Sequence, residues 1–453
     1  MRDLMMDAAT CAVEYLEGIN SRPVAPSTQA VEMLSSFDGP LPELPSDPAA
    51  VLELLDTLGS PGTMAMQSPR YFGFVIGGTL PAALAANWLA GAWDQTSSLY
   101  RVTPSTAHIE QVALRWLTEL FGLPNGAGAA FTTGATMANF SALAAARNRV
   151  LDQAGWNVES DGLIGAPPVT IIVGDEVHPT LIKGLGLLGF GRNRVVRVPV
   201  DNQGRMRTGR IPTISGPTIV CTQVGNVNTG ACDPVSEICD LVQTPGAWVH
   251  VDGAFGLWAL ASPHYAHLVA GIQKADSWAT DAHKWLNVPY DSGIAFVRHC
   301  DALRSAMAIT AEYLPTESLE RNPSDFTPEL SRRARGVEIW AALRSLGRQG
   351  VAELVERCCG HAQRFADGLR AAGYTILNQV VLNQVLVSFG DSESTERVTQ
   401  AVQEEGTCWC GRTEWQGHTA MRISVSNWAT TEADVKRSLE AIIKEARSVE
   451  PLS

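Results

Sequence analysis

Residues 248–256 read Trp-Val-His-Val-Asp-Gly-Ala-Phe-Gly, an apolar run that ends in a carboxylate and a glycine. A short apolar run of this kind, stopped by glycine, is typical of a buried strand. It places Asp252 at the carboxyl end of the strand, where open α/β sheets bind their ligands. Packing explains a carboxylate there poorly, so Asp252 is a candidate site residue.

Other β-rich runs alternate with uncharged helical stretches from about residue 80 to residue 345. They are Thr170–Asp175, Arg194–Val200, Thr218–Thr222 and Gly293–Val297. Apolar strands separated by helices imply a mostly parallel sheet covered on both faces. We therefore predict an α/β fold with a mostly parallel central sheet.

The distribution of Pro-rich, helical and β-rich stretches along the chain predicts three parts. Residues 1–80 are helical with Pro-rich interruptions, which suits an arm that lies over another surface, and residues 81–345 form the large domain. Residues 346–453 form a smaller C-terminal α+β domain, with strands near 384–389 and 421–425 and a closing helix near 432–447. A domain of about 100 residues is of ordinary size.

Composition excludes several classes of protein. The 453 residues are 45% hydrophobic and 18% charged, as in folded globular chains, and the net charge of -13 argues against a nucleic acid partner or an anionic membrane surface. Nine scattered cysteines without C-x-x-C spacing predict free thiols, no metal site and a reducing compartment. The first 20 residues lack the pattern of a signal peptide, so we expect a cytoplasmic protein.

The longest uncharged run is residues 75–93, which contains Gly77, Gly78 and Pro81. It falls short of an apolar span of about 20 residues, so no membrane helix is predicted. We interpret it as a loop followed by a buried helix.

A lysine in an unusual setting is the most informative local feature. Residues 276–287 read Asp-Ser-Trp-Ala-Thr-Asp-Ala-His-Lys-Trp-Leu-Asn, a weakly polar stretch just before the strand at Gly293. Lys284 therefore lies between His283 and a tryptophan. A solvated loop lysine is the alternative, since a reactive amine depends on a desolvated setting that the local sequence alone does not reveal.

A third segment offers a seat for an anion. Residues 129–139 run from a short apolar strand through Gly134 into an alanine-rich helix. Free backbone N–H groups at the helix start, with hydroxyls from Thr132, Thr133 and Thr136, make an anion cradle. The alternative is a simple N-capped helix.

The three segments together supply a phosphate seat, a strand-end carboxylate and an amine able to form an imine. Pyridoxal 5'-phosphate uses all three groups, since its aldehyde takes a lysine, its ring nitrogen a carboxylate and its phosphate a backbone nest. With these motifs the sequence resembles the group II pyridoxal-phosphate-dependent amino acid decarboxylases, the family of aromatic-L-amino-acid, glutamate and tyrosine decarboxylases. The likeness runs from about Tyr71 to about Trp428 and implies fold type I, the aspartate aminotransferase-like fold.

The resemblance implies specific roles for the motif residues. Lys284 would form the internal aldimine, and Asp252 would pair with the pyridinium nitrogen so that the ring accepts electrons as a quinonoid. His178, in Asp-Glu-Val-His-Pro-Thr, would stack on the ring, whereas a lone histidine is more often a hydrogen-bonded core residue. The remaining cofactor-binding residues would be His283 at the phosphate, Ala254 under the ring, and Gly134, Ala135 and Thr136 in the phosphate turn.

Looser matches concern the ring substituent and the substrate. In the family a residue after the strand that corresponds to the one at Thr218 makes a polar contact to the ring substituent of the cofactor. Asn226 and Asn228 match that region, and we take Asn228 as the candidate for the contact. Phe74 matches a wall of the substrate pocket. Arg422 is a candidate for the substrate carboxylate, with an ordinary surface arginine as the alternative.

The chain departs from the family pattern at three places. Met137 replaces a common glutamate, and Asp281 stands where relatives often have asparagine. The loop that carries the proton-donating tyrosine in relatives is shorter here, and it offers either Tyr313 as a catalytic proton donor or Phe326 near that position. A phenylalanine there is associated in the family with aldehyde formation.

The resemblance therefore predicts a carboxy-lyase that converts an L-amino acid into its amine, acting as a homodimer with shared active sites. The rivals are an aldehyde synthase or carbon-carbon lyase with the same lysine and, in a different class, a non-catalytic relative that keeps the fold. Loss of Lys284 or Asp252 would favour the last, and both residues are present.

Overall fold

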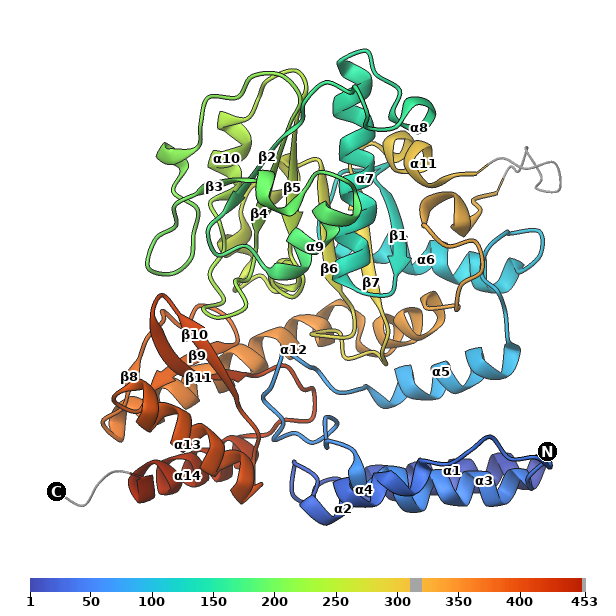
Figure 1. Ribbon diagram of the computed structural model, residues 1–453, viewed down its shortest axis with the longest axis vertical. Helices are drawn as coiled ribbons and strands as arrows, with labels where there is room; N and C mark the ends of the chain where they lie inside the picture. The colour runs from blue at the N-terminus through green and yellow to red at the C-terminus, as the bar shows by residue number, and fades with distance from the viewer. Residues whose placement is uncertain (310–319, 450–453) are drawn as a thin grey trace. The chain divides into compact units, whose positions relative to one another are not determined.

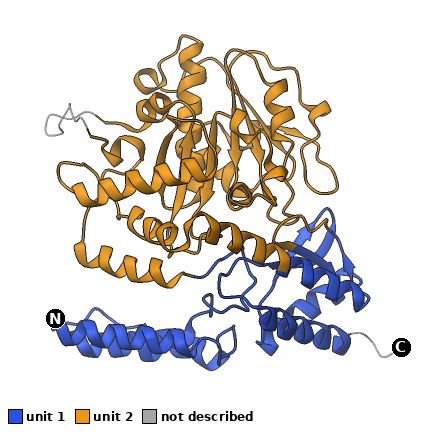
Figure 2. Ribbon diagram, turned by 180° about the vertical axis from the view of Figure 1, so that it is seen from behind, with its two compact units in different colours: residues 1–78, 361–377, 385–453 blue, residues 79–360, 378–384 orange. Residues whose placement is uncertain are grey.

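The computed structural model describes residues 1–309 and 320–449, whose contacts form two compact units (Figure 2). Unit 1 contains residues 1–78, 361–377 and 385–453, and unit 2 contains residues 79–360 and 378–384. The predicted N-terminal arm and most of the predicted C-terminal domain thus fall in the same unit. The three-part division at 80/81 and 345/346 stays a prediction.

A seven-stranded sheet forms the centre of unit 2, in the order β1-β7-β6-β5-β4-β2-β3 (Figure 1). Strand β7 runs antiparallel to both β1 and β6, and all other neighbours are parallel. The strands are β1 (Gly128–Thr132), β2 (Thr170–Gly174), β3 (Val196–Val198), β4 (Thr218–Gln223), β5 (Ala247–Asp252), β6 (Ser277–Asp281) and β7 (Gly293–Val297). The predicted α/β class with a mostly parallel sheet is confirmed.

Strand β6 is the one central strand that the sequence did not reveal. All five of its residues are buried, yet Ser277, Thr280 and Asp281 are polar. The Ser277 hydroxyl explains how this is tolerated, because it lies 2.8 Å from both the indole nitrogen of Trp248 and Nδ1 of His250. Buried polar groups that find partners across neighbouring strands do not produce an apolar run.

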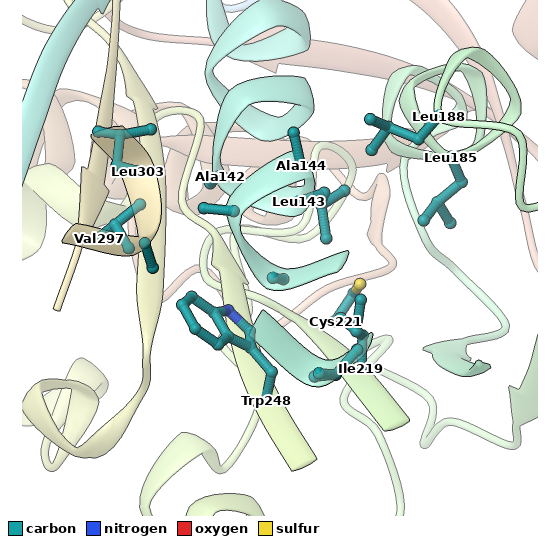
Figure 3. Packing of buried hydrophobic residues seen from close by; sticks show 14 of the residues in the cluster. Ala142, Leu143, Ala144, Leu185, Leu188, Ile219, Cys221, Trp248, Val297 and Leu303 are labelled. Carbon is teal, nitrogen blue, oxygen red and sulfur yellow. The ribbon is translucent and has the colours of Figure 1, made fainter. Parts of the chain in front are cut away.

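Helix α7 (Ala135–Gln153) packs on the sheet, and Figure 3 shows Ala142, Leu143 and Ala144 of this helix in the same cluster as Trp248 and Ile219. Ala142, Ala144 and Ala145 are almost fully buried in this cluster, together with Leu143. Short side chains let the helix axis approach the strands closely. The N-terminus of α7 lies at the edge where β6 ends, since the Ala135 N–H donates to Asp281, the last residue of that strand.

The other helices of unit 2 surround this sheet. They are α5 (Pro81–Trp93), α6 (Pro104–Leu120), α8 (Val158–Asp161), α9 (Pro179–Leu187), α10 (Val235–Leu241) and α11 (Cys300–Met307). Short 3-10 turns lie at η3 (Arg192–Arg194), η4 (Thr208–Arg210), η5 (Gly256–Ala261), η6 (Ala266–Val269), η7 (Ile272–Lys274) and η8 (Pro323–Phe326). Helix α12 (Gly336–Ala371) is interrupted at Gly347, where φ is 64°.

The expected buried helix after residue 80 is wrong in one respect. Helix α5 forms, but only Ala83 and Ala90 of it are buried. Trp88, Leu89 and Trp93 are 44%, 56% and 43% exposed. Among the described residues, no helix is long and apolar enough to cross a membrane.

Unit 1 contains a four-stranded sheet in the order β10-β11-β9-β8. Its strands are β8 (Thr375–Ile376), β9 (Gln384–Ser388), β10 (Gly411–Trp415) and β11 (His418–Ser424). Helix α13 (Ser392–Glu405) packs on this sheet, and α14 (Glu432–Val449) packs against α13. The N-terminal elements are α1 (Arg2–Gly18), α2 (Thr28–Met33), η1 (Leu34–Phe37), α3 (Pro48–Leu54), η2 (Leu55–Gly59) and α4 (Ser60–Gly62). No residue of α1 is buried.

Candidate active site

A cavity of about 380 Å³ opens in unit 2 at the carboxyl ends of the parallel strands. Its walls come from the turn before α7, from the ends of β4, β5 and β6, and from the start of α9. The lining residues are Thr133, Gly134, Ala135, Thr136, His178, Thr180, Gln223, Gly225, Val227, Asp252, Ala254, Phe255, Asp281, His283, Lys284 and Tyr290. Eight of the predicted site residues are therefore brought together.

Lys284 lies three residues beyond the end of β6, and its side chain is 21% exposed. The next residue, Trp285, is buried, and the Asn287 side chain donates hydrogen bonds to the carbonyls of Lys284 and Trp285. This tight turn directs the amine into the cavity, where Nζ lies 2.9 Å from Oδ2 of Asp281. This placement favours an amine that acts in the cavity over the alternative of a solvated loop lysine.

Asp252 ends β5 and is 3% exposed. One of its carboxylate oxygens accepts the backbone N–H of Ala254 at 3.2 Å. Burial raises the pKa of the Asp252 carboxyl above its usual range, and the charges of His178 and Lys284 oppose this rise by favouring the carboxylate. An anion at this position therefore depends on cationic groups that face it.

The N-terminus of α7 offers a backbone donor to the cavity. The Ala135 N–H donates to Oδ1 of Asp281 at 2.5 Å, and the hydroxyl residues Thr133 and Thr136 line the same wall. Glycine is required on the neighbouring strand, because a Cβ at Gly293 would overlap the backbone of Gly134. The turn can therefore lie directly against β7.

Two histidines of the cavity accept backbone N–H groups on Nδ1. His178 caps α9, and its Nδ1 accepts the Thr180 N–H at 3.3 Å. His283 accepts the Ser292 N–H on Nδ1 at 3.1 Å, its Nε2 lies 3.4 Å from Asp281, and its ring stacks on Tyr290. Burial lowers the pKa of His283, so the neutral imidazole with a proton on Nε2 is favoured.

Four predicted site residues are not placed in the cavity by the structure. Asn228 is absent from the lining, and its backbone N–H bonds to the side chain of Asn226. Phe74 and Arg422 belong to unit 1, where Phe74 stacks on Trp409 and burial lowers the pKa of Arg422 to about 10. Tyr313 lies outside the described residues. The roles of these four residues, like those of the eight that line the cavity, stay predictions.

Phe326, the other candidate of the loop, ends η8 and is 7% exposed. It belongs to the hydrophobic cluster of Ala302, Leu303 and Met307, and the Arg321 guanidinium lies over its ring. It is not one of the residues that line the cavity. Its side chain is committed to packing.

Sequence reasoning did not propose several lining residues, among them Gln223, Phe255 and Tyr290. Gln223 and Phe255 lie at or just after the strand ends that we had already singled out, so the strand-end rule applied to every strand would have found them. Tyr290 follows Lys284 by six residues and reaches the cavity through its stack on His283. No local pattern marks that residue.

Comparison with known proteins decides the family. Residues 32–390 match the family model of the pyridoxal-dependent decarboxylase conserved domain, which is more than half of the chain. The chain belongs to the pyridoxal-dependent decarboxylase family. The predicted cofactor, pyridoxal 5'-phosphate, and the predicted carboxy-lyase activity on an amino acid are thereby confirmed.

Relatives of this decarboxylase share about a quarter of its residues. It is 24% identical to the aromatic-L-amino-acid decarboxylase of Bacillus atrophaeus, with 96% of this chain and 93% of the relative covered. It is 27% identical to the L-2,4-diaminobutyrate decarboxylase of Rhizobium meliloti (strain 1021), covering 99% and 92%. The crystal structure of Oryza sativa TDC with PLP and tryptamine has the same fold, with a TM-score of 0.91, 23% identity and coverage of 99% and 97%.

The residues of this decarboxylase fit its cofactor. The Ala135 N–H and the Lys284 ammonium already hold an anion, the Asp281 carboxylate, at the start of α7. Such donors suit a phosphate, and Asp252 supplies a buried carboxylate in the same cavity. Amine, carboxylate and anion seat are thus all present.

Proposed function

We propose that this decarboxylase releases carbon dioxide from an L-amino acid to leave the corresponding amine, with Lys284, Asp252 and His178 acting in one cavity. The observation that carries the proposal is that Lys284 and Asp252 line the same 380 Å³ space, together with the N-terminus of α7. A non-catalytic relative has no need to keep this combination.

When bound, pyridoxal phosphate supplies an electron sink for the pair of electrons left by the departing carboxylate. Lys284 would hold the aldehyde, and Asp252 would keep a proton on the ring nitrogen. The Ala135 N–H, with the hydroxyls of Thr133 and Thr136, would bind the phosphate, while Gly134 would give it room. His178 would contact the ring.

Three side chains complete the cofactor contacts in this proposal. His283 donates from Nε2 to the phosphate, which its neutral tautomer supports. Ala254, which lines the cavity, would lie under the ring, as the family resemblance implies. Asn228 would contact the ring substituent, or Gln223, which lines the cavity, would make that contact.

The product is determined by the group that returns a proton to the substrate carbon. We assign this role to Tyr313, since Phe326 is packed in the core. In aerated buffer, with dioxygen as the oxidant, Tyr313→Phe should lower amine formation and raise aldehyde, ammonia and peroxide. Amine formation at the wild-type rate by Tyr313→Phe would remove Tyr313 from the mechanism.

Phe74 and Arg422 are proposed substrate contacts, with Arg422 binding the substrate carboxylate. Arg422→Gln should raise KM for the amino acid while leaving cofactor affinity unchanged. An unchanged KM would return Arg422 to a structural role in β11.

We also propose a homodimer with shared active sites. Exposed apolar side chains support it, since no residue of α1 is buried and Met5, Met6, Leu54 and Leu55 are each about half exposed. Sedimentation of the full chain at micromolar concentration should give twice the mass of 48.5 kDa. A monomer would contradict the proposal.

A cytoplasmic location is the last part of the proposal. All nine cysteines lie in the described residues and are free, four of them beside another cysteine or one residue away from one. Free thiols at such short spacing suit a reducing compartment. Cell fractionation tests this, and recovery outside the cytoplasm would contradict it.

A panel of L-amino acids tests the activity itself. Aromatic, acidic and diamino substrates should be compared for carbon dioxide release and for amine, with and without added pyridoxal phosphate. We expect release that needs the cofactor and disappears in Lys284→Ala. Cofactor-dependent ammonia without carbon dioxide would sink the proposal.

A further inference from the structure

A carboxylate occupies the place where the cofactor phosphate is expected. Asp281, the last residue of β6, is 3% exposed, and its Oδ1 accepts the Ala135 N–H at the start of α7. Its Oδ2 lies 2.9 Å from Nζ of Lys284, and its Oδ1 lies 3.4 Å from Nε2 of His283. One side chain thus engages three groups that a phosphate and its aldehyde-bearing ring would use.

The backbone holds Asp281 in this place. Its N–H donates to the carbonyl of Ala254 at 2.9 Å, and its own carbonyl accepts the indole N–H of Trp258 at 2.9 Å. A Cβ built on Gly134 would lie 3.5 Å from Oδ1, so the turn and the carboxylate are in near contact. The main chain therefore has no freedom to move the carboxylate away, and only side-chain rotation can do so.

We infer that Asp281 is an internal competitor of the cofactor phosphate, which binds the helix N-terminus and Lys284 in the cofactor-free protein and weakens the binding of phosphate-bearing ligands. This inference rests on the proposed function of the cavity. A phosphate at the α7 N-terminus takes the Ala135 N–H from Asp281, and an aldehyde takes the Lys284 amine. Asp281 then faces a second anion at close range without its cationic partner.

In the cofactor-free chain, the Asp281 carboxylate neutralises positive charge in the cavity. Without Asp281, the Lys284 ammonium and the helix N-terminus would present two positive groups to each other in a largely buried cavity. The carboxylate neutralises both until the cofactor arrives. An asparagine at 281 would accept the Ala135 N–H but leave Lys284 unpaired, so it would favour phosphate.

The test compares two ligands that differ only in the phosphate. Cofactor-free wild-type protein and Asp281→Asn are titrated with pyridoxal 5'-phosphate and with pyridoxal, and dissociation constants are measured by absorbance. The ratio of the dissociation constant for pyridoxal to that for pyridoxal phosphate measures how much the phosphate group contributes to binding. We expect Asp281→Asn to raise this ratio about tenfold or more, because one negative charge beside the phosphate is removed.

The matched control is Asp276→Asn, which removes a partly buried carboxylate just before the other end of β6. Its Oδ2 accepts the Val249 N–H, away from the cavity lining, so the ratio should stay at the wild-type value. If Asp281→Asn does not fold by circular dichroism, Asp281→Ser removes the same charge with a smaller side chain. Inorganic phosphate should also raise the unfolding temperature of the folded variant more than that of wild type.

The outcomes distinguish failure of the proposed function from failure of the inference about Asp281. Wild-type protein that binds neither ligand overturns the proposed function and this inference together. Wild-type protein that binds both, with an unchanged or lower ratio in the Asp281 variants, overturns the inference alone. A raised ratio in Asp276→Asn of equal size also overturns it, since the effect would then be one of net charge.

Discussion

Asp252 and Lys284 line one cavity from the ends of two adjacent parallel strands, Asp252 as the last residue of β5 and Lys284 three residues after β6. Parallel pairing of these strands, with Asp252 opposite Ala279, makes this placement unavoidable once the sheet forms. The carboxylate and the amine are also linked by charge, since Lys284 favours the ionised form of Asp252. Removing either one changes the electrostatics of the other.

Removing the amine is the most direct test of the site. Lys284→Ala should abolish the visible absorbance of the bound cofactor and lower carbon dioxide release by about 10³-fold or more, since no other nucleophile replaces it. Absorbance spectra and a radiometric assay measure both effects. Lys183→Ala, an exposed residue of α9, is the control and should behave like wild type. Retained visible absorbance in Lys284→Ala would show that another lysine had been missed.

Replacing the carboxylate should separate binding from chemistry. Asp252→Asn still accepts the Ala254 N–H but cannot hold a proton on the cofactor's ring nitrogen, so we expect kcat to fall about 10²- to 10⁴-fold with the cofactor still bound. Asp252→Glu, which keeps the charge, should retain more activity than Asp252→Asn. Equal kcat values for the two variants would mean that charge at position 252 is not what matters.

Much of this site could be predicted because its residues follow rules of local chemistry. Asp252 was found from a strand end, the anion cradle at Gly134 from a glycine turn before a helix, and Lys284 from its neighbours. The rest depends on long-range packing. Tyr290 lines the cavity and stacks on His283, a residue on the same side of the site. Strand β6 is buried although it contains polar residues, because the partners of these residues lie on β5. Sequence periodicity carries no trace of such partners.

The same limit applies to the surface of the molecule. Residues 81–93 are apolar enough to predict burial, yet Trp88, Leu89 and Trp93 remain exposed in the single chain. Apolar composition predicts that a face is covered, and it does not distinguish a cover within the chain from one supplied by a second copy. The dimer proposal and the error about this helix therefore have the same physical origin.

Substitution of Gly293 tests the proposed phosphate-binding turn at Gly134 without removing any polar group. Gly293→Ala adds a methyl group that overlaps the backbone of Gly134, so we expect about 1–3 kcal/mol of destabilisation from overpacking and weaker cofactor binding. Urea unfolding and cofactor titration measure the two effects. Gly209→Ala, where a Cβ meets nothing within 4 Å, should change neither. Wild-type affinity in Gly293→Ala would show that the turn tolerates displacement.

His250 gives the protein a stability that depends on pH. The ring is fully buried on β5, with Nε2 2.8 Å from Oδ1 of Asn139 and Nδ1 2.8 Å from Oγ of Ser277. Burial lowers the pKa of His250 to about 3, so the folded protein keeps the ring neutral while the unfolded chain takes up a proton near its usual value. The unfolded state therefore binds more protons between these two values.

Stability contributed by the neutral ring is full above the unfolded pKa and is lost as the pH falls toward the folded pKa. Between about pH 6 and about pH 4 the free energy of unfolding of wild type should fall by about 2 kcal/mol more than that of His250→Gln, which cannot titrate. Urea unfolding at each pH measures the difference, and the exposed His418→Gln is the control. Parallel pH profiles for wild type and His250→Gln would mean that His250 is protonated in the folded protein.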